Sequence, residues 1–432
     1  MRVAGPLRRT PALILATSVL AGATVGPAMA TNGLNSLGFG LEALAMAGAD
    51  VAVARDPLAL NTNPAGLAQV RGTQVEAQGA LVHELGIEHS DRFNPPTDIQ
   101  NDYFPVGNLA LSQRLDGLPL TLGASLVASG GAGFDYGRID TAFGTKDRLS
   151  SMFGIVRASV GGGMQVTDRL ALGASIGLSY SRLDQEFFPD TSVIGPSGPF
   201  FGTRIENAWA YGAGFRLGVH WRPLDRLAFG LTYSSKVDLP VEDGRMDVDM
   251  TAAGLGKVRY RDLKLDGLAQ AQEVGFGVAV QLAPDWLVAA DLGWIDWSGA
   301  LGTTTIRARD PDHAQAPAVL RISATQDWRD QYVLALGTAF RPMPALTLWA
   351  GYNYGRNPIP SRHLSPLLAS IGEHHLTAGA GWQVGRDLRL GLAVEYLLPN
   401  EVTYDNPELP FGPDARARAS YVALHVGLSW RL

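Results

Sequence analysis

The sequence predicts an all-β fold: a transmembrane antiparallel β-barrel of about 14 strands, with its lumen plugged by a small, mostly helical N-terminal hatch. Three observations support this prediction. They are an export leader, long segments in which apolar residues alternate with small or polar ones, and connections that alternate between short and long. Soluble β-sandwiches have shorter strands, usually of about 5–6 residues, and no reason to sort their connections by length.

The chain is low in charge and rich in glycine, with 18% charged residues, 51 Gly and no Cys. Globular chains average about 25% charged residues, so this chain has unusually little charge to present to water. The absence of Cys excludes a disulfide framework, a thiolate metal site and a cysteine nucleophile. A formal net charge of −6 without a basic cluster argues against nucleic acid as a partner.

The N-terminus has the pattern of a leader peptide. A basic start is followed by an apolar stretch at residues 11–23 and by Ala28-Met29-Ala30, a cleavage site of the A-x-A type. The apolar stretch is too short to span a bilayer stably. We therefore predict a signal peptide at residues 1–30 and a mature chain beginning at Thr31. Beyond it no apolar run reaches about 18 residues, so no transmembrane helix is expected.

Alternation with period two is the dominant signal in residues 73–432. The segment that starts at Leu170, LALGASIGLSY, places large apolar side chains on one face and Gly, Ala and Ser on the other. Successive side chains of a strand point to opposite faces, so such a segment has one face for lipid and one for a lumen. About 14 segments can be placed, an even number as barrels require. They start near Thr73, Val106, Leu118, Ser151, Leu170, Arg204, Arg226, Ala271, Trp286, Asp330, Leu346, Glu373, Leu388 and Arg416.

The connections between these segments alternate in length. Short turns such as Leu115-Asp116-Gly117 and Pro223-Leu224-Asp225 alternate with long loops, as in outer-membrane barrels. The long loops are expected at residues 89–105, 132–148, 184–203, 239–270, 298–329, 357–371 and 399–415. Alternation fades in 239–270, where one hairpin could be misplaced. A closed barrel pairs every backbone group within lipid, so we expect an outer-membrane barrel with both termini in the periplasm.

Residues 31–72 do not alternate and are rich in Gly and Ala. Residues 38–50 are compatible with a helix, and Asn63-Pro64-Ala65-Gly66 predicts a turn. A compact segment ahead of a barrel predicts a hatch inside the lumen. An ordinary porin has no such segment, so the hatch argues against an open general porin.

Several motifs resemble those of the FadL-type long-chain fatty-acid and hydrocarbon transporters. The resemblance covers the hatch and residues 286–432 well, and the region between them mainly by pattern. Its motifs are Thr31-Asn32-Gly33, Gly38-Phe39-Gly40, Ala47-Gly48-Ala49, Asn63-Pro64-Ala65-Gly66, Trp294-Ile295-Asp296-Trp297-Ser298 and Trp328-Arg329-Asp330-Gln331-Tyr332. The chain departs from the family at its end, where Leu432 stands in place of the usual aromatic residue.

The resemblance implies capture of hydrophobic ligands by the outer loops and passage through a wall opening at a kink in the third strand. The third segment ends Ser129-Gly130-Gly131-Ala132-Gly133, so Gly130, Gly131 and Gly133 are the kink candidates. An ordinary Gly-rich strand end is an equally good interpretation. The hatch or gate residues that the resemblance implies are Thr31, Asn32, Gly33, Asn63, Pro64 and Ala65.

Two groups of residues are candidates for ligand binding. Alternation places Arg157 and Arg216, together with Arg389, on the lumen face, where a cation could bind a fatty carboxylate. The alternative is that these arginines form salt bridges to Asp291, Glu395 or the hatch. The expected outer loops carry apolar residues that could capture ligands or pack loop on loop. These are Phe187, Phe188, Phe200, Phe201, Leu364, Leu367 and Leu368.

No catalytic, cofactor or metal site is predicted. Gly173-Ala174-Ser175-Ile176-Gly177 matches a nucleophile elbow but lies in the middle of a strand, where that motif cannot function. His83-Glu84 with His89 misses the metalloprotease spacing, and Glu373-His374-His375 is an isolated cluster.

We therefore expect a monomeric outer-membrane protein, and not an enzyme, for passive uptake of hydrophobic compounds, most readily long-chain fatty acids. Its predicted partners are these small molecules, the outer-membrane lipid and lipopolysaccharide. The alternatives are a hydrocarbon or aromatic-compound channel of the same fold, a general porin, and a structural or adhesion barrel.

Overall fold

The computed structural model of the protein describes residues 32–101, 103–196 and 198–432. The predicted signal peptide and the predicted gate residue Thr31 lie outside the described residues. No helix within this part of the chain is both long and apolar enough to cross a membrane.

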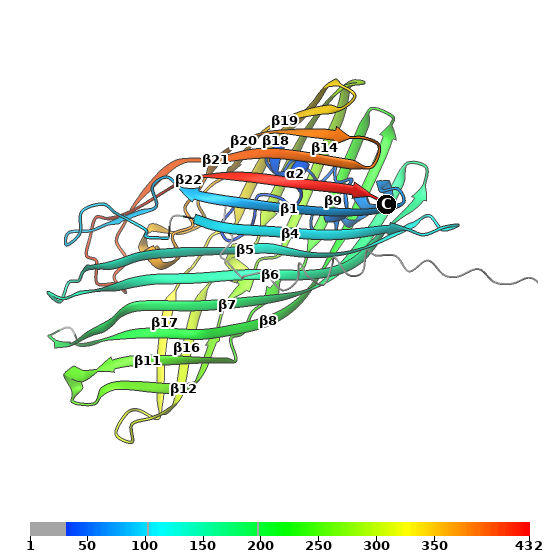
Figure 1. Ribbon diagram of the computed structural model, residues 1–432. Coiled ribbons are helices and arrows are strands. Elements are labelled where there is room, and N and C mark those ends of the chain that lie inside the picture. Colours follow the sequence, from blue (N-terminus) through cyan, green and yellow to red (C-terminus); the bar gives the residue numbers. More distant parts are fainter. Residues whose placement is uncertain (1–31, 102, 197) are drawn as a thin grey trace, which may run out of the picture.

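The described chain forms a closed antiparallel barrel of 14 strands (Figure 1). The first barrel strand pairs with the last, from Gln74↔Arg431 to Glu84↔Tyr421, and this pairing closes the wall. Each predicted segment corresponds to one of these strands. In order around the barrel they are β1 (Thr73–Glu84), β4 (Tyr103–Arg114), β5 (Leu120–Asp140), β6 (Lys146–Thr167), β7 (Leu170–Gly195), β8 (Gly198–Leu224), β9 (Leu227–Ser234), β14 (Glu273–Ala283), β15 (Trp286–Ile295), β18 (Gln331–Met343), β19 (Leu346–Gly355), β20 (His374–Val384), β21 (Leu388–Tyr404) and β22 (Ala415–Arg431).

The two faces of the wall differ as the alternation predicts. On β7, Ile176 is 65% exposed and Leu178 is 52% exposed, whereas Ser175 and Ser179 are buried on the lumen side. An apolar side chain exposed in this way is stable when its surroundings are lipid. The outward face of the wall is therefore the membrane surface.

Four of the predicted outer loops contain extensive strands, and this corrects the loop assignment. Residues 132–148 and 184–203 are mostly extensions of β5 to β8. Residues 239–270 and 298–329 form separate strands. They add β11 (Asp243–Met250), β12 (Gly256–Asp266), β16 (Thr303–Pro311) and β17 (Val319–Thr325) to the free edge of β8 as an outer sheet. Their buried side chains, such as Met246 and Tyr260, belong to the same core as Phe134 and Phe188 on the extended strands β5 and β7. The remaining short elements are β2 (Glu88–Ser90), β3 (Thr97–Asp98), β10 (Val237–Asp238), β13 (Ala269–Gln270), η4 (Thr251–Ala253), α3 (Trp297–Ala300), η5 (Ser361–His363) and η6 (Pro366–Leu368).

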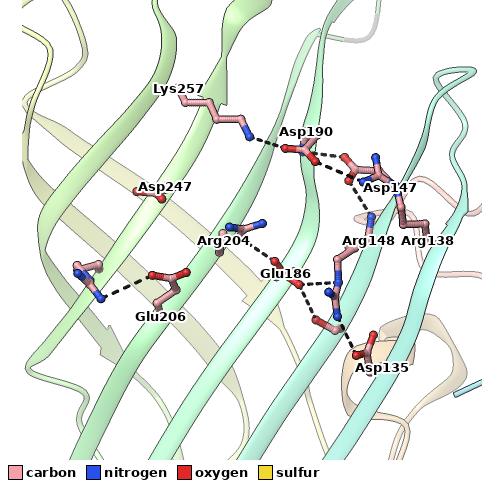
Figure 2. A network of polar contacts seen from close by, with 12 residues as sticks. Asp135, Arg138, Asp147, Arg148, Glu186, Asp190, Arg204, Glu206, Asp247 and Lys257 are labelled. Carbon is pink, nitrogen blue, oxygen red and sulfur yellow. Dashed lines mark hydrogen bonds and ion pairs between the residues drawn. The ribbon is translucent and has the colours of Figure 1, made fainter. Parts of the chain in front are cut away.

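Ion pairs join neighbouring strands where β5 to β8 extend towards the outer sheet (Figure 2). Arg148 on β6 contacts Asp135 on β5 and Glu186 on β7, each at 2.8 Å, and Glu186 also binds Arg204 on β8 at 2.7 Å. Lys257 on β12 pairs with Asp190 in the same network. Because basic and acidic groups alternate across the strands, this network stabilises the extended strands without a strong net charge.

The N-terminal segment, residues 32–72, lies inside the barrel (blue in Figure 1). It contains α2 (Leu41–Ala45), η2 (Pro57–Asn61) and η3 (Pro64–Gln69). Asp56 and Asn63 begin the two 3-10 helices by accepting hydrogen bonds from the backbone amides of Ala59 and Ala65. The segment is the predicted hatch by position, and nearly all of its apolar side chains are buried.

Polar side chains of the wall hold this segment in place. Asp291 on β15 accepts hydrogen bonds from the backbone amides of Asp50 and Val51, both at 2.7 Å. Asn63 donates to the carbonyls of Val51, at 2.8 Å, and of Val219 on β8, at 3.0 Å. These contacts satisfy backbone groups that would otherwise be buried without partners.

Glycine on the lumen face of the wall allows the segment to pack against it. A Cβ atom on Gly173 would lie 2.2 Å from the backbone nitrogen of Ala65, so we expect Gly173→Ala to displace η3. The overpacking should lower stability by about 1–3 kcal/mol. The midpoint of thermal unfolding in detergent measures this effect.

Gly107→Ala is the matched control, because its added Cβ would face open space with its nearest neighbour at 3.9 Å. Equal midpoints for the two variants would show that close packing of the segment against β7 does not contribute to stability.

Candidate functional site: a lumen cavity beside a gap in the wall

The barrel wall has a break between β4 and β5. The two strands pair from Arg114↔Thr121 to Asn108↔Val127, and among the described residues no further pair joins them although both strands continue. Beyond the Asn108↔Val127 pair, β4 remains paired with β1 as far as Tyr103, and β5 remains paired with β6. The wall therefore opens between residues 103–107 of β4 and the part of β5 beyond Val127.

A β-bulge on β5 lies at this break. The β5–β6 register shifts between Ala128 and Gly130, and Gly131 has a φ of 140°, a conformation that favours glycine. A Cβ atom on Gly130 would lie 2.2 Å from the carbonyl oxygen of Leu34. The bulge thus coincides with the glycines predicted as a kink, except that Gly133 lies beyond it in regular pairing with Met152.

Residues 34–38, which we call the strip, line the inner side of the break. Gly131 donates its backbone N–H to the carbonyl of Leu34 at 3.2 Å, and Asn35 forms an isolated β-bridge with Gly130. The hydroxyl of Ser36 donates to the carbonyl of Ala128 at 3.2 Å. The strip therefore bonds to the backbone of β5 beyond Val127, where β4 no longer pairs with it.

A cavity of about 150 Å³ lies in the lumen next to the strip. Its walls come from the N-terminal segment and from strands β5, β6, β8, β9, β13, β14, β15, β18 and β19. Leu37, Phe39, Val51, Val274 and Leu292 supply apolar surface. Arg157, Arg216, Gln270, Glu273 and Asn35 supply polar groups.

The two predicted lumen arginines line this cavity but differ in their partners. Arg216 lies 3.6 Å from Glu273 and donates to the carbonyl of Thr62 at 3.2 Å, so it forms a salt bridge. Arg157 donates to Gln270 Oε1 at 2.8 Å and to Ser179 Oγ at 3.3 Å. In the described part of the chain, Arg157 forms no ion pair with a carboxylate. Arg389 lies elsewhere, over the Trp349 ring and 3.8 Å from Glu42 of the N-terminal segment.

The acidic groups around the cavity are already engaged. Glu273 accepts from Asn35 at 2.6 Å besides pairing with Arg216, and Asp291 accepts the two backbone N–H groups of the N-terminal segment. Burial, together with the neighbouring carboxylates of Asp56 and Asp291, raises the pKa of Asp50 well above its usual value.

A smaller pocket of about 40 Å³ lies directly behind the break and is lined by Val106, Asn108 and Ala128. Ser36, Leu37 and Gly38 line both this pocket and the larger cavity. The strip is thus the partition between the lumen cavity and the gap in the wall.

The other predicted site residues lie apart from the break. Asn63, Pro64 and Ala65 pack against Gly173 and Gly218 of β7 and β8, where they anchor the N-terminal segment. Asn32 lines the cavity, and Gly33 packs against the ring of Trp297.

The predicted loop phenylalanines lie on the outer extensions of β7 and β8. Phe187 stacks on Phe188 at 4.9 Å, and Phe188 lies 6.1 Å from Phe411, between ring centroids. Phe188 is buried, whereas Phe187, Phe200 and Phe201 are half-buried. Packing between the outer segments therefore accounts for much of this apolar surface. This agrees with the interpretation that these residues pack loop on loop.

Sequence reasoning missed the strip and Gln270. The strip follows Thr31-Asn32-Gly33 directly, but nothing in its composition indicates a contact with β5. Gln270 lies in the stretch where alternation fades. Within the described residues, no group of three or more His, Asp or Glu side chains is placed to hold a metal ion.

The fold is similar to those of several solved outer-membrane transporters. Three of them are the toluene transporter TodX of Pseudomonas putida (22% identity, TM-score 0.77, 93% of this chain and 100% of that chain), the toluene transporter TbuX of Ralstonia pickettii (20%, 0.72, 92% and 99%) and a FadL homologue of Pseudomonas aeruginosa (15%, 0.71, 92% and 99%). At these identities the likeness establishes a shared fold. A comparison with curated proteins gave no match.

A family model described as outer membrane protein transport protein (OMPP1/FadL/TodX) matches residues 15–431, which is nearly the whole chain. The protein therefore belongs to this family of outer-membrane transporters of hydrophobic compounds, in agreement with the sequence resemblance and with a barrel whose outward face is apolar.

Proposed function

We propose that the protein takes up small hydrophobic compounds of about one aromatic ring, and that they leave the lumen sideways through the gap between β4 and β5. The volume of the cavity supports this substrate class, because a protein cavity of about 150 Å³ accommodates one benzene ring. An extended long-chain acid does not fit this volume without movement of the N-terminal segment. The toluene transporters among the similar structures agree with this choice.

The single observation that supports the route is the position of the strip between the cavity and the gap. A compound in the cavity reaches the gap when residues 34–38 move away from β5. The strip is bonded to β5 by only a few hydrogen bonds, of about 1 kcal/mol each, so thermal motion can break them. Lateral release delivers the compound into the membrane and avoids the water beyond the barrel.

A disulfide between the strip and β5 should stop uptake. Ser36→Cys with Ala128→Cys places two thiols where a side chain already bonds to the β5 backbone, and the natural chain contains no Cys to compete. We expect uptake of labelled toluene by cells carrying the oxidised variant to fall to background, and reduction to restore it.

The control is Ala279→Cys with Ala289→Cys, which joins two residues that are already paired across β14 and β15. This disulfide should leave uptake unchanged. Normal uptake through the oxidised Ser36–Ala128 variant would rule out movement of the strip as the gating step.

Long-chain fatty acids are a second candidate substrate, and Arg157 is the observation that favours them. A guanidinium without a carboxylate partner, at the edge of an apolar cavity, suits the carboxylate of an amphiphilic acid. The same cavity could therefore hold the head of such an acid while its chain extends past the strip.

Arg157→Ala separates the two candidates. Loss of a charged hydrogen bond costs about 1.5–3 kcal/mol, so oleate affinity should fall by about 10-fold to 100-fold if the carboxylate binds there. Toluene affinity should not change. Binding of both labelled compounds to the purified barrel in detergent provides the measurement, with Arg182→Ala on the outer face as control. An unchanged oleate affinity would remove Arg157 from the binding site.

A further inference from the structure

Gln270 has a buried side chain with three hydrogen bonds in the cavity. It belongs to β13, which pairs with β10, and both lie where the chain between β9 and β14 bends into the lumen. Val237 of β10 packs against the inner face of β8 at Gly212 and Gly214, where a Cβ atom would lie 2.6 Å from the valine methyl groups. The glycines of β8 thus allow the bend that brings Gln270 to the centre of the barrel.

The amide of Gln270 joins the cavity to the wall break. Its Oε1 accepts from Arg157 Nη2 at 2.8 Å and from Ser179 Oγ at 2.9 Å. Its Nε2 donates to Ser129 Oγ at 3.2 Å, and Ser129 lies within the bulge of β5. One side chain therefore contacts both the cation of the cavity and the strand that borders the gap.

The oxygen of Gln270 occupies the position on Arg157 that a carboxylate would take. An amide oxygen carries only a partial charge, so its hydrogen bond to a guanidinium is weaker than that of a carboxylate. An acid that enters the cavity can therefore displace Gln270 from Arg157, whereas a hydrocarbon has no group with which to do so.

We propose that Gln270 is an internal competitor for Arg157, which a ligand carboxylate displaces and whose displacement frees Ser129 in the β5 bulge. This inference rests on the second candidate of the proposed function, because it needs an acid in the cavity. Gln270 is then a positioning and specificity residue. It lowers the affinity of the cavity for acids, because an acid must first displace it from Arg157, and a hydrocarbon does not compete with it. Its release loosens β5 beside the gap only when an acid is bound.

Two substitutions of Gln270 test the proposal in opposite directions. Gln270→Leu removes the competitor, so oleate should bind about fivefold more tightly, the equivalent of one hydrogen bond. Gln270→Glu keeps the shape and supplies a fixed carboxylate to Arg157, so oleate should bind at least about tenfold more weakly. Toluene affinity should change less than oleate affinity in both variants, because toluene has no group that competes with Gln270 for Arg157.

The matched control is Gln272→Leu. Gln272 lies two residues away and bonds to Tyr233 and Asp296 rather than to Arg157. Heat-dependent migration in detergent gels checks that each variant is folded, and the nearly isosteric Gln270→Glu keeps the test valid if the leucine variant fails to fold.

Hydrogen–deuterium exchange provides a readout that a merely structural role would not change. Oleate should speed exchange in residues 127–134 of the natural protein, toluene should not, and in Gln270→Leu exchange should be fast without ligand. Equal shifts of oleate and toluene affinity in the Gln270 variants would overturn the proposal and make Gln270 a structural residue.

Failure of the inference and failure of the proposed function give different results. If toluene binds to the natural protein and oleate binds to neither the natural protein nor Gln270→Leu, the competitor role is wrong and uptake of hydrocarbons stands. If neither compound binds to any variant, both proposals are wrong.

Discussion

The structure depends on the rule that backbone N–H and C=O groups within lipid must find partners inside the protein. Strand pairing meets this rule around the barrel, and β4 and β5 depart from it beyond Asn108↔Val127. There the backbone of Leu34 and Asn35 contacts Gly130 and Gly131 in place of a neighbouring strand. The N-terminal segment is therefore a part of the wall as well as a filling of the lumen, and in the proposed route the movement of the strip is what opens the wall.

The N-terminal segment divides into a fixed part and the strip. Residues 40–70 are held by Asp291, by Asn63 and by close packing against lumen glycines such as Gly173. Glu42 adds an anchor: burial would raise its pKa, but Arg55, Arg389 and the Trp349 N–H lower it to about 2. The strip contacts β5, bonds to Glu273 through Asn35 and packs Leu37 against Leu44 and Ala47. Local stability follows the density of such contacts, and the proposed route requires the strip to move while residues 40–70 stay in place.

The sequence was sufficient for the barrel because one face of every membrane strand must be apolar, and this requirement repeats with period two. It was insufficient for the outer sheet, because the alternation fades in residues 239–270. Arg157 and Arg216 could not be told apart, since the difference comes from Glu273, which lies more than fifty residues further along the chain. Gln270 had no signal for the same reason: its partners Arg157 and Ser129 meet it only through the inward bend at β10 and β13. The glycines of the bulge could be named as kink candidates from the sequence, because a bulge restricts the residue type at its own positions and this restriction is local in the chain.

A cation without a carboxylate partner is at odds with the proposed binding of hydrocarbons, and the contacts of Arg157 resolve the conflict. A buried charge is costly unless hydrogen bonds replace its water, and Gln270 and Ser179 supply such bonds. With these bonds formed, the guanidinium is satisfied and the remaining walls, such as Leu37 and Val274, present apolar surface to a neutral guest. An acid meets the same site as a competitor for those bonds. The choice between neutral and acidic compounds therefore depends on how strongly the protein solvates its own arginine, rather than on the presence of the charge itself.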